Sequence, residues 1–529
     1  MLIHARLIAA LTVAPVAALS RMSDRTPLRQ QRLLPVARTY SPAMEKRIVK
    51  NIAINFVGSV VPVFISLATV PAYLHSMGVE RYGVLNLVWA LIGYFSVLEL
   101  GTSIATENQI ARVRDANDGS IERIFWSACA LNFVSGVIGG AIIYVAAYVY
   151  VTHGTKVDPQ FQHEVIASLP WIAAAVPLAN VTWVFAGAIT AVERFTSFNT
   201  SQTIGTLLFQ LLPLGAIWCF SPSLAVVIPA AVCARVIAGI LLGVATFRAL
   251  HIRRVHKPDW PTVVSLFRYG RWQLLFSGAG MIAQTLDRML VGTLLGARAV
   301  AYYATPQNLV TRLNILPGAM LRTLFPRLSA STREDADELA RSALALLNGV
   351  FTPCVIVAMF ALEPFMHVWL GAHMATMSAP FGRVLIVGVW LAGQSSILGI
   401  LIQAQSHPAQ AARVSWVQLP FFVTALWFGI HRFGVMGAAV VVVIKALCDY
   451  AAFLYFAELH LRSIAGNMIT HIAFLGAALF LASELSTLPA MVAAAWVLVA
   501  ANLAWSLYES AMLRELVRRV WGRLGLRMG

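Results

Sequence analysis

The chain has 529 residues, of which 59% are hydrophobic and 12% are charged, and its mean hydropathy is +0.74. A typical soluble domain carries about 25% charged residues, so this composition excludes an ordinary soluble protein and indicates a membrane protein. The net charge of +16 raises the question of a nucleic-acid partner. However, the cations lie in short segments between apolar runs, which is typical of cytoplasmic loops, and we expect no nucleic-acid partner.

The first 43 residues precede the long apolar runs. Arg6 and the segment LIAALTVAPVAAL resemble the charged and apolar regions of a signal peptide, and residues 21–43 are basic and polar. Alternatively, translation begins at Met44, because MEKRIVKN supplies a short basic start directly before the first long span. We predict that residues 1–43 are a dispensable extension rather than a cleaved signal, because a first transmembrane span can itself target the chain.

Fourteen apolar runs follow, bounded by polar residues, glycine or proline. A helix of about 17 to 25 residues crosses about 30 Å of hydrocarbon, and each run is long enough to do so. We therefore predict an all-α polytopic membrane protein with about 14 transmembrane helices. The predicted helices are residues 51–75, 83–106, 124–152, 165–191, 202–220, 223–248, 270–295, 300–325, 343–370, 382–404, 413–431, 434–457, 468–484 and 489–510.

Loop charge predicts the orientation of these helices. Every second loop is basic, as are the segments before the first span and after the last one, whereas the opposite side carries only Arg81, Lys156, Arg298 and Arg432. Lys and Arg are enriched in cytoplasmic loops. We therefore expect an inner-membrane protein with both termini in the cytoplasm, and an even number of spans.

The sequence carries no motif of known catalytic or nucleotide chemistry. It contains no P-loop, no GxSxG, no HExxH and no cysteine–histidine cluster of metal-site spacing. The cysteines lie within or at the ends of apolar runs, so we expect neither a disulfide framework nor a metal site: Cys129, Cys219, Cys233, Cys354 and Cys448. The outer loops are too short for a catalytic domain. We expect no enzymatic activity, no metal and no cofactor.

Two similar outer turns indicate an internal repeat. MGVERYGVLNLVWAL (77–91) and LGARAVAYYATPQNLV (295–310) both place glycine and tyrosine at a turn, six spans apart. Because the number of spans between the two turns is even, both halves have the same orientation. This predicts two six-helix lobes related by a pseudo-two-fold axis along the membrane normal, with a cavity between them. The predicted parts are an N-terminal lobe (44–250), a basic cytoplasmic linker (251–265), a C-terminal lobe (266–460), two further helices (461–512) and a basic tail (513–529).

These stretches also carry a family resemblance. Residues 82–112 and 286–329 resemble the polysaccharide transporters, or O-antigen type flippases, of the multidrug/oligosaccharidyl-lipid/polysaccharide exporter superfamily. Glu99-Leu100-Gly101 stands where the family commonly has Asp-Leu-Gly, and the family's Asp-Arg pair falls on Asp287 and Arg288. The resemblance implies alternating access and translocation of polyprenyl-pyrophosphate-linked oligosaccharides across the bacterial inner membrane, with polysaccharide polymerase and export machinery as possible partners.

Ionisable residues within the spans are the candidate functional residues, because charges at membrane depth usually face protein or water. Arg235, Arg312 and Lys445 lie about 11 or 12 residues into their spans, near the midplane. Together with Arg288 they form a predicted cationic, substrate-binding set. Of these, Arg235 and Arg312 are the stronger candidates, because neither has an acid within one turn of its own helix.

The carboxylates have two open interpretations each, structural or coupling. Consecutive helical residues point about 100° apart, so Asp287 and Arg288 are not a simple internal pair, and at least one should meet another helix or the cavity. Lys445 and Asp449 are four residues apart and can pair on one face. Glu99 could exchange a proton during transport or be fixed by a neighbouring helix. Arg383, Glu363 and His367 lie nearer outer ends, where snorkelling is expected.

Two other functions compete with the flippase. A cation-coupled multidrug antiporter of the same superfamily should prefer acidic groups around its cavity, whereas the midplane groups here are Arg235, Arg312 and Lys445. A membrane-embedded glycan polymerase or ligase should present a substantial outer loop with catalytic side chains, which this chain lacks. Charge placement and the resemblance therefore favour the flippase.

Overall fold

The computed structural model describes residues 42–93, 102–113, 119–154, 158–192, 194–252, 254–404, 408–457, 461–509 and 513–514. Within these ranges the chain forms fourteen α-helices and one 3-10 helix, and no strand. The helices divide into two compact units, each with its own buried side chains. A helix satisfies most of its backbone polar groups inside its own segment, as hydrocarbon requires.

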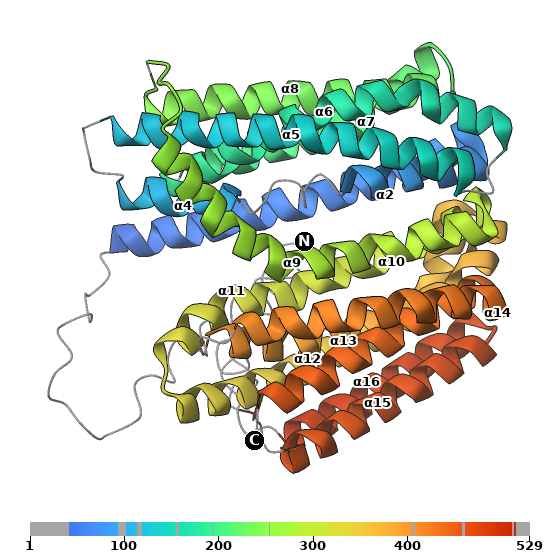
Figure 1. Cartoon of the computed structure of the whole chain (residues 1–529). Helices are drawn as coiled ribbons and strands as arrows, with labels where there is room; N and C mark the ends of the chain where they lie inside the picture. Colours follow the sequence, from blue (N-terminus) through green and yellow to red (C-terminus); the bar gives the residue numbers. More distant parts are fainter. Residues whose placement is uncertain are drawn as a thin grey trace, which may run out of the picture. The chain divides into compact units, whose positions relative to one another are not determined.

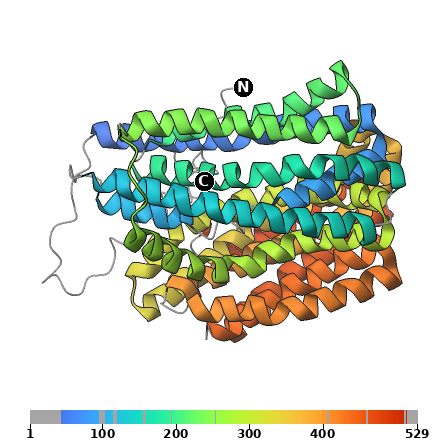
Figure 2. The same cartoon turned by 45° about the horizontal axis from the view of Figure 1, so that its top comes forward.

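Unit 2 contains residues 40–305 and 419–438. Helices α5, α6 and α8 run side by side, α7 packs on α8, and α2 packs on α7 (Figures 1 and 2). Small residues allow the close approach of α5 and α6, because Gly136 lies against Pro177 and Gly140 against Ala173. The helices of this unit are α2 (Pro42–Gly93), α4 (Thr102–Arg112), α5 (Ser120–His153), α6 (Pro159–Ala191), α7 (Phe195–Cys219), α8 (Leu224–Leu250), α9 (Trp260–Leu295) and the start of α10 (Ala297–Val310).

Unit 1 contains residues 306–418 and 439–529, as far as these are described. Helix α12 is its centre, since α13, α15 and α16 all pack against it (Figure 1). Trp390 and Phe351 are fully buried there, and the indole N–H of Trp390 donates to the Thr352 hydroxyl at 3.0 Å. The elements are the end of α10, η2 (Thr311–Asn314), α11 (Ile315–Ala330), α12 (Arg333–Leu370), α13 (Ala372–Ala404), most of α14 (Pro408–Phe456), α15 (Leu461–Glu484) and α16 (Leu488–Glu509).

Glycines make the tightest turns between spans. Gly78 (φ 79°) interrupts α2, and Gly434 (φ 60°) interrupts α14, so each of these long helical stretches is two helices joined at a glycine. Gly296 (φ 88°) joins α9 to α10 in the same way. A positive φ strains any residue with a Cβ atom, which is why these positions carry glycine. The two glycine turns used to predict the repeat are the turns at Gly78 and Gly296.

The predicted all-α polytopic fold is confirmed. Each of the fourteen predicted spans falls on helix within the described ranges, although residues 94–101 of the second span lie outside them. Eight of the described helices are long and apolar enough to cross a membrane by length and composition. Several helices begin earlier than predicted, α9 at Trp260 and α12 at Arg333, because Asp259 and Thr332 cap these helices there.

The lobe boundary predicted at residues 250–266 differs from the division between the compact units, which falls inside α10 at Thr305 and Pro306. The reason is that α9 packs against α2, α4 and α5. The hydroxyl of Tyr150 donates to the Met289 carbonyl at 2.6 Å, and Gly292 lies against Leu87. The pseudo-two-fold relation of two lobes stays a prediction.

The segment predicted as a linker is bound to unit 2. His256 Nε2 lies 2.9 Å from Glu122 Oε2, and the backbone N–H of Asp259 donates to the Ser127 hydroxyl at 2.9 Å. Asp259 then caps α9, because its carboxylate accepts from the Thr262 hydroxyl and backbone N–H. These hydrogen bonds, helped by the charge of Arg123, lower the pKa of Asp259. The helix therefore begins at Trp260, inside the predicted linker.

Candidate functional site

Arg235 is an exposed residue on the side of α8 opposite its exposed apolar side chains. Exposed apolar side chains of α8 include Ile240, Leu241 and Val244. Val244 is nine residues from Arg235, which at about 100° per residue places the two on opposite sides of the helix. Arg235 is nevertheless exposed. Helix α8 thus has one face suited to lipid and an accessible, cationic position on the other.

The guanidinium of Arg235 contacts an aromatic ring and no acid. Its Cζ atom lies 4.7 Å from the ring centroid of Phe209 on α7, a cation–π contact. No carboxylate in the described part of the chain pairs with it. An arginine in this state keeps its hydrogen-bond donors available for an anion.

Arg312 lies in η2, where the helical hydrogen-bond pattern tightens between α10 and α11. Pro317 has no N–H, so the carbonyl of Leu313 lacks its usual α-helical partner. Arg312 is exposed, as are Thr311, Asn314 and Ile315. No hydrogen bond or ion pair joins Arg312 to another residue in the described ranges. The midplane position predicted from sequence is therefore an accessible cation at a break in helical geometry.

The Asp287–Arg288 pair is held within unit 2. Asp287 is 2% exposed, and its Oδ2 atom accepts a hydrogen bond from the hydroxyl of Tyr303 on α10 at 2.7 Å. Its Oδ1 atom accepts from the Arg288 backbone N–H at 2.7 Å. The expectation that at least one of Asp287 and Arg288 meets another helix is confirmed for Asp287, which a tyrosine contacts. The contact joins α9 to α10 across the turn at Gly296.

Lys445 and Asp449 form the predicted i,i+4 pair, with Nζ and Oδ2 2.6 Å apart on α14. Both side chains are largely buried. The pairing is confirmed, while a role of Lys445 in substrate binding stays a prediction. Glu99 lies outside the described residues. The roles of Arg288 and Arg312 in transport are likewise untested predictions.

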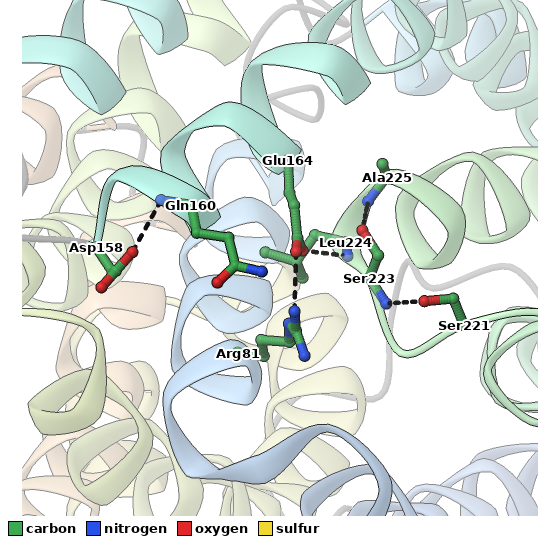
Figure 3. A network of polar contacts seen from close by, with 8 residues as sticks. All are labelled: Arg81, Asp158, Gln160, Glu164, Ser221, Ser223, Leu224 and Ala225. Atoms are coloured by element: carbon green, nitrogen blue, oxygen red, sulfur yellow. Dashed lines mark hydrogen bonds and ion pairs between the residues drawn. The ribbon is translucent and has the colours of Figure 1, made fainter.

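The sequence analysis missed several ion pairs between helices, and two of them have partly or fully buried arginines. Arg383 on α13 is 5% exposed and pairs with Glu363 on α12, so snorkelling was the wrong interpretation of Arg383. Burial against α12 gives its guanidinium a carboxylate partner instead of water. Arg81 pairs with Glu164 at 2.9 Å, and the other oxygen of Glu164 accepts from the Leu224 N–H at 2.8 Å (Figure 3). Spacing could not reveal either pair, because the partners are far apart in sequence.

The described ranges contain no group of three or more His, Cys, Asp or Glu side chains that could hold a metal ion. Among the candidate cations predicted near the midplane, Arg235 in unit 2 and Arg312 in unit 1 are exposed and have no ion-pair partner in the described ranges. Arginine donates two parallel hydrogen bonds to phosphate or carboxylate. Each position is therefore suited to recognising an anionic ligand.

Comparison with known proteins places these features in a wider group. The sequence profile of a family described as "Polysaccharide biosynthesis protein" matches residues 48–332. A Shigella flexneri protein named as an O-antigen transporter is 24% identical over 406 residues, covering 76% of this chain and 96% of that protein. The lipid II flippase MurJ, in an inward closed conformation, matches with a TM-score of 0.67 at 10% identity, covering 87% of this chain and 99% of that one.

A multidrug resistance transporter of the MATE family, in an inward-facing conformation, matches with a TM-score of 0.65 at 14% identity, covering 79% of this chain and 99% of that one. At such identities the solved structures show a shared fold and nothing more. The fold alone therefore does not distinguish a flippase from a multidrug transporter, and the charged residues must supply that distinction.

Proposed function

Because the chain belongs to the polysaccharide biosynthesis protein family, we propose that it is a flippase for lipid-linked oligosaccharides that serves surface polysaccharide synthesis. Similarity to an O-antigen transporter and a shared fold with the lipid II flippase MurJ support this function. The cargo is an oligosaccharide on a polyprenyl diphosphate, and the membrane is the bacterial inner membrane, with both chain termini in the cytoplasm. A polymerase and export machinery would take up the translocated units.

The physical task is to move a large polar head group past hydrocarbon. Transferring unpaired polar groups out of water costs several kcal/mol for each group, so the sugars and the diphosphate need a polar path. The lipid tail can stay in the bilayer throughout. Alternating access supplies such a path by exposing the same polar positions first to one side and then to the other. Two compact units with separate interiors are compatible with this movement.

The observation that carries the proposal is the accessible, unpaired Arg235 on the side of α8 opposite its apolar face. A charge held near the middle of a span without a partner is costly, and an anionic cargo compensates for that cost. Arg312 has the same properties in unit 1. In contrast, Asp287 is 2% exposed and bonded to Tyr303, and Asp449 is paired with Lys445. This distribution favours an anionic cargo over the cationic drugs of an antiporter.

A complementation experiment tests the function. A strain lacking this gene should lose surface glycan and accumulate lipid-linked oligosaccharide, and the wild-type gene should reverse both changes. Arg235→Ala and Arg312→Ala should each abolish or sharply reduce the glycan while the protein stays in the membrane. The Arg→Lys variants should be intermediate, because lysine keeps the charge but loses the planar fork.

Exposed Arg432 is a matched control, because it lies beside the turn at Gly434, away from the middle of a span. Arg432→Ala should therefore leave the glycan near normal. Near-normal glycan from both Arg235→Ala and Arg312→Ala, at equal protein levels, would remove these residues from the transport path.

A further inference from the structure

An aromatic stack lies behind Arg235 inside unit 2. The guanidinium of Arg235 lies over the ring of Phe209 on α7. Trp89 on α2 contacts the same ring, with the two ring centroids 5.9 Å apart. The edges of Tyr73 and Tyr82 meet Trp89 at 6.0 and 6.4 Å, with interplanar angles of 90° and 89°. Aromatic pairs in such arrangements stabilise one another beyond simple burial. The side chains of three helices, α2, α7 and α8, therefore form one continuous stack that ends at Arg235.

Hydrogen bonds beside the stack fix α7 to α2. The hydroxyl of Tyr73 donates to the carbonyl of Gln210 at 2.8 Å, and the hydroxyl of Thr69 lies 3.2 Å from Gln210 Oε1. Gln210 directly follows Phe209 in the chain. Gln210 is thus held through both its backbone carbonyl and its side chain, and these bonds fix α7 next to the ring of Phe209.

The cation–π contact with Phe209 uses none of the N–H donors of Arg235, and no carboxylate in the described ranges pairs with them. A guanidinium that lies on a ring uses its face, while its five N–H groups point outward in its plane. The indole N–H of Trp89 is buried behind Phe209 and has no hydrogen-bond partner in the described structure. Of the two side chains that contact Phe209, Arg235 is the exposed one, and its donors have no protein acceptor within the described part of the chain. The complementary ligand is rich in acceptors and negatively charged, as a diphosphate is.

We propose that Phe209, supported by Trp89, positions the guanidinium of Arg235 to bind the diphosphate of the lipid-linked oligosaccharide. Phe209 acts through Arg235 and is a positioning residue. This inference rests on the proposed function for the identity of the cargo, but the binding of a diphosphate can be measured without transport.

The test measures the stabilisation of the purified full-length chain by inorganic pyrophosphate, as the shift in melting temperature over a range of concentrations. Phe209→Leu should raise the half-saturating concentration about tenfold, which corresponds to loss of a partly desolvated cation–π contact. Phe209→Tyr keeps the ring and should bind close to the wild type. Arg235→Ala should remove the shift, and adding Phe209→Leu to Arg235→Ala should change nothing more.

Phe428→Leu is the matched control, because Phe428 makes a second cation–π contact, in which the Cζ atom of Arg432 lies 5.7 Å from the ring centroid. It should leave pyrophosphate binding unchanged. A merely structural role of Phe209 would lower the melting temperature without pyrophosphate and leave the half-saturating concentration unchanged, and that result would overturn the inference. Normal pyrophosphate binding by Arg235→Ala would overturn it as well.

The inference and the proposed function fail differently. If Phe209→Leu weakens pyrophosphate binding about tenfold but the wild-type chain does not restore surface glycan to the deletion strain, the site is supported and the flippase is rejected. Restoration of glycan by the wild type and by Phe209→Leu, together with unchanged pyrophosphate binding, would reject the positioning role and leave the function standing.

Discussion

Replacing Glu164 should destabilise unit 2, because this one carboxylate joins three helices. Its Oε1 atom pairs with Arg81 of α2 at 2.9 Å, and its Oε2 atom accepts the N–H of Leu224, the first residue of α8, at 2.8 Å (Figure 3). The side chains of Arg81 and Glu164 are only 22% and 12% exposed. Solvent therefore cannot fully replace either contact.

The expected cost follows from these contacts. A carboxylate that satisfies a helix N-terminus contributes about 0.5–2 kcal/mol, and a hydrogen bond to a charged group about 1.5–3 kcal/mol. Allowing for the partial exposure of both partners, Glu164→Ala should lower the free energy of unfolding by about 3 kcal/mol. Glu164→Gln keeps an acceptor for the Leu224 N–H but loses the charge, so it should cost about half as much.

The assay is denaturant-induced unfolding of the full-length chain in detergent, with the ion pair isolated by a double-mutant cycle of Arg81→Ala and Glu164→Ala. Glu484→Ala is the control, because Glu484 is exposed at the end of α15, and it should change stability by less than about 0.5 kcal/mol. The reasoning is wrong if Glu164→Ala is equally neutral, or if Gln is as harmful as Ala.

Three further predictions concern unit 2. A Cβ atom on Gly83 would lie 1.9 Å from the Ala297 carbonyl oxygen, so Gly83→Ala should force α2 and α10 apart and cost about 3 kcal/mol. Gly215→Ala is the control, because nothing lies within 4 Å of a Cβ atom there, and it should be neutral or stabilising in the same unfolding assay. If Gly83→Ala and Gly215→Ala change the free energy of unfolding equally, the close contact at Gly83 is refuted. Tyr303→Phe should lower the free energy of unfolding by about 1–3 kcal/mol, because it leaves the buried carboxylate of Asp287 without its hydroxyl donor. Tyr455→Phe, at a residue that is 73% exposed, should have no effect. Similar losses of stability in both variants would contradict this role of Tyr303. Because the folded pKa of Asp259 is depressed, its stabilisation is present above the unfolded value of about 3.9 and is lost as the pH falls through the folded value. The melting-temperature difference between wild type and Asp259→Asn should therefore be full near pH 7 and shrink below about pH 4, and a difference independent of pH would argue against the cap.

Hydropathy predicted the helical content and the positions of the helices well, because hydrocarbon imposes a length and a composition on each helix. The same information could not predict which helices pack together. Helix α9 contacts α2, α4 and α5 through Gly292, the Tyr150 hydroxyl and the Gln109 amide. These are single contacts between residues distant in sequence, and they leave no periodic pattern.

The candidate residues show the same limit. The i,i+4 spacing of Lys445 and Asp449 was enough to predict their pairing, because both lie on one helix. The partner of Asp287 could not be predicted, since Tyr303 lies on the next helix and reaches back across the turn at Gly296. Phe209 was missed because an aromatic residue in an apolar span carries no signal of its own. Only its position under Arg235 distinguishes it.

The central claim is tested most directly by reconstitution of the purified chain in liposomes that contain a lipid-linked oligosaccharide in both leaflets. A membrane-impermeant glycosidase added outside digests only the outward-facing glycans. The account predicts that wild-type chain makes nearly all of the glycan digestible, whereas Arg235→Ala leaves about half protected, as protein-free liposomes do. Wild-type liposomes that keep half of the glycan protected, or Arg235→Ala liposomes that lose that protection as fast as the wild type, would contradict it.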